Sequence, residues 1–173
     1  MALKQFRKQP KKVEQIHESG LNDCWAAALS SWLDEQSIHS TQEQLITQYV
    51  KYVTDALVLK SDNFQKVADE INIKMSFKKF NNGNELTSDY LAERLAVSCL
   101  YLGYAGAGSP MGHVVVVYGV DHPQGKEASI SLMDPLLTGG GYRIMALNEL
   151  KGKLGVVGWR WKPFTKLTGD GYW

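Results

Sequence analysis

Cysteine is scarce in this chain, since Cys24 and Cys99 are its only two cysteines among 173 residues. Two cysteines cannot build the disulfide framework of a small secreted domain. A single bridge between them would consume Cys24, which we interpret below as a reactive thiol. No pair of cysteines or histidines has the close spacing of a zinc site. We therefore expect no metal site and no cofactor.

The sequence also lacks a long apolar run and a strong charge of one sign. No run of about 18 apolar residues is present, so we expect no transmembrane helix. The basic N-terminus has no apolar centre of the kind found in a secretory signal peptide. The net charge of +1 gives no overall bias towards nucleic acid or a membrane surface. We expect a soluble protein that neither inserts into a membrane nor binds nucleic acid.

The first twelve residues differ in composition from the rest. Residues 1–12 carry five Lys and Arg side chains, and Phe6 is the one aromatic residue among them. This pattern indicates a solvated, flexible basic arm rather than a nucleic-acid-binding tail. Residues 13–173 contain no internal repeat and no low-complexity tract. Because 44% of the chain is hydrophobic, we expect residues 13–173 to form a single domain with one sizeable core.

The most informative stretch of the sequence surrounds Cys24. An apolar helix face follows this residue, formed by Trp25, Ala28, Leu29, Trp32 and Leu33. The side chain of Asn22 or Asp23 can accept hydrogen bonds from the first turn, so either is a candidate N-cap. At the positive end of the helix dipole a thiol pKa is lowered, which favours a nucleophilic thiolate. The alternative is a small buried core cysteine, and the helix start alone does not decide between the two.

A histidine and an aspartate stand at the same end of an expected hairpin. His113 opens the apolar run Val114–Val120, and the alternating stretch Ser129–Met133 ends at Asp134. A base and a carboxylate that orients it are what a cysteine nucleophile requires. His122 is the competing base, but it lies in the turn at the far end of the hairpin. We therefore expect His113 to serve the cysteine.

The remaining pattern predicts a helical first half and a β-rich second half. Capping residues predict helices that begin at Thr41, at Ser61 or Asp62, and at Thr87 or Ser88. Strands are expected at 73–77, 97–104, 113–120, 128–133, 142–145 and 156–161. The strands from 97 onwards would form one antiparallel sheet, and the cysteine helix would pack on it and present Cys24 to His113. Cys99 lies in an expected interior strand, where we predict a packing role.

Three short motifs carry a resemblance to a known superfamily. They are Cys24-Trp25-Ala26-Ala27, Gly112-His113-Val114-Val115-Val116 and Met133-Asp134-Pro135. From about Val13 to Trp161 the chain resembles the papain-like cysteine peptidases of bacteria. Within them it is similar to the double-glycine leader peptidases and to the AvrRpt2-type secreted effectors.

The resemblance implies both a fold and a set of roles. The fold would be α+β, with an N-terminal helical half whose nucleophile helix packs on a C-terminal antiparallel sheet. Cys24 would be the nucleophile, His113 the general base and then acid, and Asp134 the orienting residue.

The resemblance also implies a glutamine shortly before the nucleophile, whose amide helps to bind the oxyanion. Gln15 lies nine positions before Cys24, farther than the usual pattern has it. Glu18 is nearer the usual place, but a carboxylate has no donor unless it is protonated. We expect Gln15 to be the donor, with Glu18 as the rival position. Asn22 is a further amide, although capping is its expected task.

The implied function is a cysteine protease that cleaves peptide bonds in a protein or peptide substrate through a thioester intermediate. The same triad serves amidases, deamidases and transglutaminase-type acyl transfer, so these remain alternatives. A third alternative is a peptidase-like binding domain that has lost its oxyanion hole.

The resemblance, the small size and the basic arm favour a bacterial effector or toxin domain. It would be delivered by a secretion system into a target-cell cytoplasm and matched by an inhibitor or immunity protein. Leader processing for a transporter is the rival role. It would normally come with membrane and nucleotide-binding domains, which this sequence does not contain.

Overall fold

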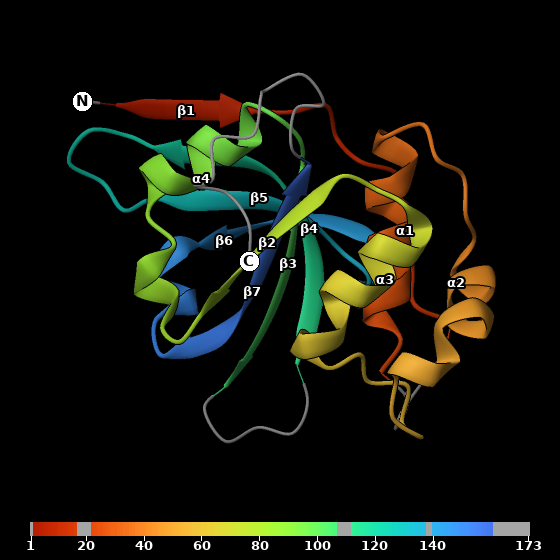
Figure 1. Cartoon of the computed structure of the whole chain (residues 1–173). Helices are drawn as coiled ribbons and strands as arrows, with labels where there is room; N and C mark the ends of the chain where they lie inside the picture. The colour runs from red at the N-terminus through yellow and green to blue at the C-terminus, as the bar shows by residue number, and fades with distance from the viewer. Residues whose placement is uncertain (1, 17–21, 107–111, 138–139, 161–173) are drawn as a thin grey trace.

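A computed structural model describes residues 2–16, 22–106, 112–137 and 140–160. Helices dominate the first half of the chain and strands the second (Figure 1), as the patterning predicts. The helices are α1 (Cys24–Glu35), α2 (Gln42–Tyr49), α3 (Phe64–Ile71) and α4 (Ser88–Leu95). The strands are β1 (Leu3–Phe6), β2 (Met75–Phe80), β3 (Leu100–Gly106), β4 (His113–His122), β5 (Ser129–Asp134), β6 (Gly141–Ala146) and β7 (Lys153–Arg160).

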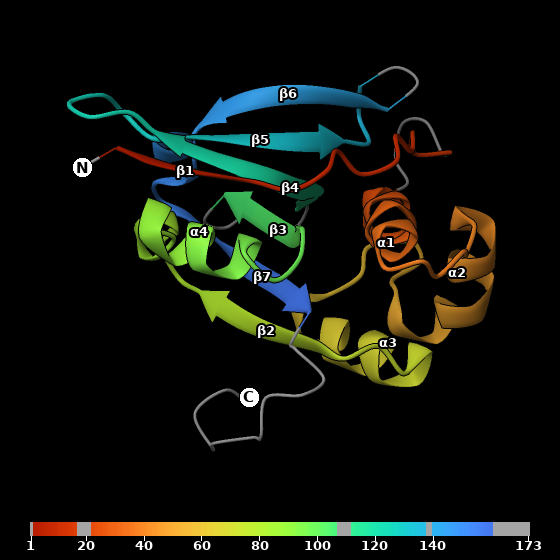
Figure 2. The ribbon, with the colours of Figure 1, turned by 90° about the horizontal axis from the view of Figure 1, so that it is seen from above.

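The strands form one antiparallel sheet in the order β2-β7-β3-β4-β5-β6, and β1 pairs with β4. Helices cover the sheet on both faces, with α1 and α3 on one face and α4 on the other (Figures 1 and 2). Val114 and Val116 of β4 belong to the core under α1, whereas Val115 and Val117 belong to the core under α4. Burial on both faces is why β4 reads as a continuous apolar run.

Helix α1 is fixed to its surroundings by buried polar groups as well as by apolar packing. Trp25 and Trp32 are each 1% exposed. Their indole N–H groups donate to Leu57 O at 2.9 Å and to Cys99 O at 2.8 Å. The Tyr101 hydroxyl of β3 donates to Trp25 O at 3.0 Å. Because buried aromatic donors need partners, these bonds fix the position of the helix start relative to β3.

The expected caps form at two helices. At α2, Thr41 Oγ1 accepts from Gln44 N at 3.2 Å and Gln44 Oε1 accepts from Thr41 N at 2.9 Å, which is a complete capping box. At α4, Thr87 Oγ1 accepts from Tyr90 N at 3.2 Å.

The capping prediction is wrong at α3, whose N-cap residue is Asn63 and not Ser61 or Asp62. The capping prediction is also wrong at α1. Asp23 occupies the N-cap position there, but its side chain makes no capping hydrogen bond. Asp23 Oδ2 instead accepts from Ile16 N at 3.2 Å and from Gln42 Nε2 at 2.6 Å. The Asp23 side chain therefore bonds to other parts of the chain instead of capping its own helix.

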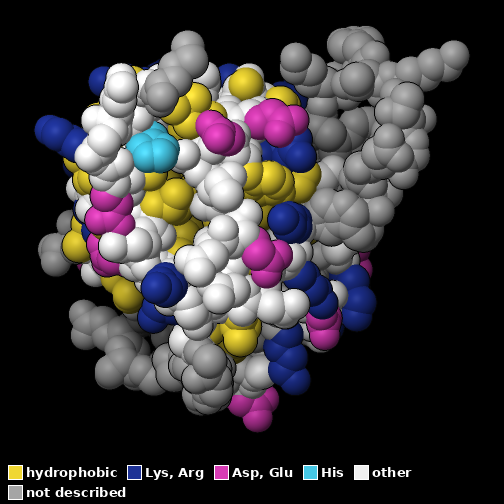
Figure 3. Space-filling view, turned by 90° about the vertical axis from the view of Figure 1, so that its left-hand side faces the viewer, with side chains coloured by type: hydrophobic (Ala, Val, Ile, Leu, Met, Phe, Trp, Pro, Cys, Tyr) yellow, Lys and Arg dark blue, Asp and Glu magenta, His cyan; other side chains and the backbone are white. Residues whose placement is uncertain are grey.

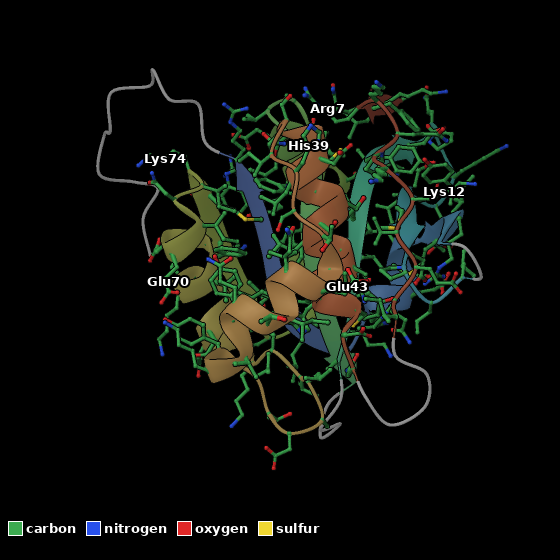
Figure 4. All side chains as sticks on the ribbon, turned by 90° about the vertical axis from the view of Figure 1, so that its right-hand side faces the viewer. Arg7, Lys12, His39, Glu43, Glu70 and Lys74 are labelled. Atoms are coloured by element: carbon green, nitrogen blue, oxygen red, sulfur yellow. The ribbon has the colours of Figure 1, made fainter. Side chains whose placement is uncertain are left out.

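The N-terminal segment contains strand β1, in a region where the sequence predicted a flexible arm. Residues Leu3–Phe6 pair with Gly119–His122 of β4. Arg7 Nη2 then donates to Glu35 Oε1 at 3.1 Å, and Ser31 Oγ donates to Lys11 O at 2.5 Å, so the segment runs along α1 (Figure 4). The division of the chain at Lys12 stays a prediction.

No helix among the described residues is long and apolar enough to span a membrane.

The pairing of β3 with β7 leaves no space for a side chain at Gly155. A Cβ placed there would lie 2.0 Å from Gly103 O, a backbone atom that cannot swing away. We predict that Gly155→Ala lowers the free energy of unfolding by about 1–3 kcal/mol, the usual cost of overpacking. Gly103→Ala is the matched control, because its Cβ would meet only side-chain atoms at 3.4 Å or more. Urea denaturation measures both variants, and equal losses would contradict this close packing.

Candidate active site

Cys24 is the first residue of α1 and is 2% exposed. Its Sγ donates to Asn22 Oδ1 at 2.9 Å, and Asn22 Nδ2 donates to Gly112 O at 2.8 Å. Asn22 therefore joins the thiol to the residue that immediately precedes β4. This tertiary contact, rather than helix capping, occupies its side chain.

His113 and Asp134 meet as the hairpin pattern predicts. His113 Nε2 lies 2.7 Å from Asp134 Oδ1, and Asp134 is 4% exposed. Asp134 Oδ1 also accepts from Leu136 N at 3.0 Å, and its Oδ2 accepts from Arg143 Nε at 2.8 Å. Arg143 is a site residue that sequence reasoning missed. It lies on an expected strand, but only the β5–β6 register brings it beside the carboxylate.

The partners of Asp134 decide its charge. Burial alone would raise the pKa of this carboxyl, but hydrogen bonds from His113, Leu136 and Arg143 outweigh it and lower the pKa to about 2. The carboxylate is therefore ionised at neutral pH and accepts a hydrogen bond from the Nε2–H group of His113. In a neutral imidazole the lone pair then lies on Nδ1. His113 Nδ1 is thus the atom able to take up a proton.

The thiol of Cys24 does not have the low pKa that the helix start predicted. Burial raises its pKa to about 12, and the negative charges of Asp23 and Asp134 act in the same direction. Hydrogen bonding to the Val114 and Trp25 amides lowers the pKa, but not enough to offset burial. In the resting protein the thiol is therefore protonated at neutral pH.

Cys24 and His113 both line a hollow of about 330 Å³. Cys24 and Asn22 line it from the start of α1, whereas Gly112 and His113 line it from the start of β4. Its other walls come from β3, β7, the segment before α3 and the first residue of α3, and they include Leu59, Phe64, Tyr104 and Leu154. The rings of Tyr104 and His113 are also nearly perpendicular, with centroids 5.9 Å apart. The hollow is bounded by both halves of the fold, as expected of a substrate cleft.

The other residues singled out in the sequence lie elsewhere. Gln15 N donates to Pro135 O at 3.1 Å, so Gln15 lies beside the end of β5, but it is not among the described residues that line the hollow. Glu18, the rival oxyanion position, lies outside the described residues. His122 ends β4 at the opposite end from His113, with Nδ1 2.8 Å from Ser88 Oγ.

Neither cysteine is in a disulfide, and Cys99 is fully buried in the core, with Sγ 3.9 Å from Lys8 O. Across the part of the chain that the structure describes, no three His, Cys, Asp or Glu side chains are grouped to hold a metal ion.

Comparison with solved structures supports the papain-like fold. The chain is similar to the crystal structure of UfSP from C. elegans, with a TM-score of 0.62 and 13% sequence identity. The match covers 92% of this chain and 34% of the UfSP chain, so the protein spans about a third of that chain. At this identity the likeness concerns the fold alone. It confirms the predicted α+β architecture of N-terminal helices on a C-terminal antiparallel sheet.

Comparison of the sequence identifies the family. No curated protein sequence matches the chain. Residues 5–153, which include the cysteine helix and the whole of β4 and β5, match the family described as papain-like cysteine protease AvrRpt2. The chain therefore belongs to the AvrRpt2 family of papain-like cysteine proteases.

Proposed function

We propose that this protein hydrolyses peptide bonds of a polypeptide substrate with Cys24 as nucleophile, His113 as general base and acid, and Asp134 as the residue that orients His113. One observation carries the proposal. The bond of 2.7 Å between His113 and Asp134 leaves His113 Nδ1 as the proton acceptor, in a residue that lines the same hollow as Cys24. Membership of a cysteine protease family supports peptide hydrolysis as the reaction.

The protonated thiol determines how the reaction begins. Because the pKa of Cys24 is about 12, the thiol loses its proton to His113 Nδ1 as Sγ attacks the substrate carbonyl carbon. The imidazolium then donates that proton to the leaving amine as the carbon–nitrogen bond breaks, which leaves a thioester. Water attacks the thioester and gives a proton to His113, which returns it to the departing sulfur. The ionised Asp134 stabilises the imidazolium in both halves.

The oxyanion formed in each half requires hydrogen-bond donors. The backbone N–H of Cys24, at the start of α1, is one candidate, and we propose Gln15 as the side-chain donor. Its backbone bond to Pro135 places it near the end of β5, and its Oε1 atom is buried, which indicates an inward-turned side chain. Asn22 is a further side-chain candidate, since its Oδ1 atom lies beside Sγ and its Nδ2 group has a second hydrogen besides the one donated to Gly112 O.

The biological setting follows from the family. We propose that the protein acts as a secreted bacterial effector or toxin whose activity in a target-cell cytoplasm is controlled in its producer by an inhibitor or immunity protein. Support for this role comes from the AvrRpt2 family match. Amidase, deamidase and acyl-transfer activities use the same thioester, so analysis of the products distinguishes them from peptide hydrolysis.

Cys24 supplies the first test. We predict that Cys24→Ala abolishes cleavage of a proteome-derived peptide library, measured by mass spectrometry of new N-termini, whereas Cys99→Ala does not. In the wild-type protein, alkylation of Cys24 by iodoacetamide should accelerate about tenfold per unit from pH 7 to 9, because the thiolate fraction rises steadily below a pKa of about 12. Cleavage by a folded Cys24→Ala protein would refute Cys24 as the nucleophile. An alkylation rate that is already constant at pH 7 would instead show a thiolate in the resting protein, and it would refute only the protonated starting state of the thiol.

The two histidines of β4 supply the second test. His113→Ala should reduce turnover of the same library by roughly 100- to 10,000-fold, the scale of a lost general base. His122→Ala should change turnover little, since His122 lies at the other end of β4. The turnover of Asp134→Asn should lie between those of His113→Ala and His122→Ala, because the substitution removes the charge that stabilises the imidazolium. If His122→Ala were the inactive variant, the assignment of the base would be wrong.

The oxyanion donor is the subject of the third test. Gln15→Ala should lower kcat by roughly 100- to 1,000-fold with little change in KM, since the donor acts on charge that develops in the transition state. Gln9→Ala is the matched control, because Gln9 lies in the same segment and contacts Tyr118 outside the site. A neutral Gln15→Ala combined with a sharply more active Glu18→Gln would instead show that Glu18 occupies the donor position.

A further inference from the structure

A second hollow, of about 650 Å³, adjoins the catalytic one. The two share Ser61, Asp62, Phe64 and Val156 in their walls, so they lie side by side. From this junction the second hollow continues over β2, α4 and the end of β7. A polypeptide whose scissile bond lies at Cys24 can extend into it without leaving the protein surface.

The second hollow surrounds the edge of the sheet. Strand β2 is outermost in the strand order of the described residues and pairs with β7 alone. Neighbouring side chains of a strand point to opposite faces, so Lys79 faces the α3 side and Lys78 faces the α4 side. Because residues from both faces line the hollow, the strand edge runs through it. Such an edge offers backbone hydrogen bonds to an added extended segment.

The side chains around this edge are basic and aromatic. Arg94 of α4 lies 5.0 Å from the ring centroid of Tyr90 and 4.8 Å from that of Trp159, and Lys78 Nζ lies 4.7 Å from that of Tyr90. These contacts hold both cations at the wall of the hollow. Guanidinium and ammonium groups held in this way suit a carboxylate, with Arg94 able to bind it in bidentate fashion.

The charge of the hollow differs from that of the whole protein. Lys78, Lys79 and Arg94 line it, and Asp62, which pairs with Lys79, is the one carboxylate among its described lining residues. Two more carboxylates lie outside the lining, with Glu85 4.0 Å from Lys78 and Glu93 3.1 Å from Arg94. The chain as a whole is nearly neutral, and charges of both signs are mixed on the face that Figure 3 shows. The lining residues therefore have an excess of cations over carboxylates, and each of the three cations has one carboxylate neighbour.

We propose that the second hollow is a specificity subsite for an acidic side chain of the polypeptide substrate, which runs as an extended segment along the edge of β2. Lys78 and Arg94 bind the carboxylate, and the rings of Tyr90 and Trp159 pack against the segment. The inference rests on the proposed function in one respect, namely that the same polypeptide occupies the catalytic hollow. A polypeptide is favoured over a nucleic acid because the hollow adjoins a peptidase cleft.

Binding is measured first, on the full-length Cys24→Ala protein, by fluorescence anisotropy of labelled octapeptides. One peptide alternates Glu with Thr, a second alternates Gln with Thr, and a third alternates Lys with Thr. We expect the Glu peptide to bind at least about fivefold more tightly than the other two, with a preference that weakens as salt is added. Arg94→Gln combined with Lys78→Gln should abolish the preference.

Lys66→Gln is the matched control, since Lys66 is an exposed cation of α3 that does not line the hollow. If the double variant does not fold, the two single variants replace it, and each should lose part of the preference. Equal binding of the Glu and Gln peptides would overturn the proposal. Displacement of the Glu peptide by an oligothymidine at equal affinity would also overturn it.

The second measurement is cleavage of a proteome-derived peptide library by the protein with Cys24 intact. We expect Asp and Glu to be enriched at a fixed distance from the scissile bond, and Lys78→Glu with Arg94→Glu to replace this enrichment with Lys and Arg. Cleavage without any acidic preference would overturn the subsite and leave the proposed function intact. A preference for the Glu peptide in binding, with no cleavage at all, would uphold the subsite and refute the proposed function.

Discussion

The packing of α1 against the middle of the sheet is the constraint on which the site depends. Cys24 can lie near His113 only because the apolar face of α1 is buried against β3 and β4. The hydrogen bonds of Trp25, Trp32 and Tyr101 then fix the helix along and around its axis. Apolar burial stabilises the packing of α1 on the sheet, whereas these directional hydrogen bonds select one position of the helix on it. A site that requires placement within a fraction of an ångström depends on the second kind of interaction.

The same burial sets the electrostatics of the thiol. A helix N-terminus stabilises a thiolate by a modest amount, whereas removing a charge from water costs far more. Two buried carboxylates, Asp23 and Asp134, add to that cost because both are negative. Both carboxylates have hydrogen-bond partners, since Asp23 accepts from Ile16 and Gln42 at the helix start and Asp134 is bonded to His113. In the proposed mechanism, therefore, the thiol transfers its proton to His113 during the attack, and no thiolate is formed before the substrate reacts.

The sequence predicted those parts of the structure that depend on periodicity and local hydrogen bonding. The alternation in Ser129–Met133 and the apolar run after His113 were sufficient to place His113 and Asp134 at one end of a hairpin. The capping box at Thr41 is a local pattern of four residues, and it forms as expected. These features need no knowledge of the rest of the chain.

Most of the errors have a different origin, because they involve a partner distant in sequence. Asn22 reaches Gly112, and Asp23 reaches Gln42, so neither side chain caps α1. Arg143 joins Asp134 only through the β5–β6 register, and β1 is too short to show a period. The thiol pKa follows the same rule, because the degree of burial of Cys24 depends on the whole fold.

A row of aromatic contacts connects the two hollows and gives the cleft its shape. Phe64, in the wall that both hollows share, packs its ring against Phe77 at 6.1 Å and against Tyr101 at 5.3 Å between centroids. Tyr101 in turn donates to the backbone of Trp25, next to Cys24. These four side chains are buried and closely packed, so the wall of the second hollow cannot shift without disturbing the start of α1. The distance between Cys24 and the edge of β2 is therefore set by the packing of the core, and in the proposed function this distance would fix how far the acidic side chain lies from the scissile bond.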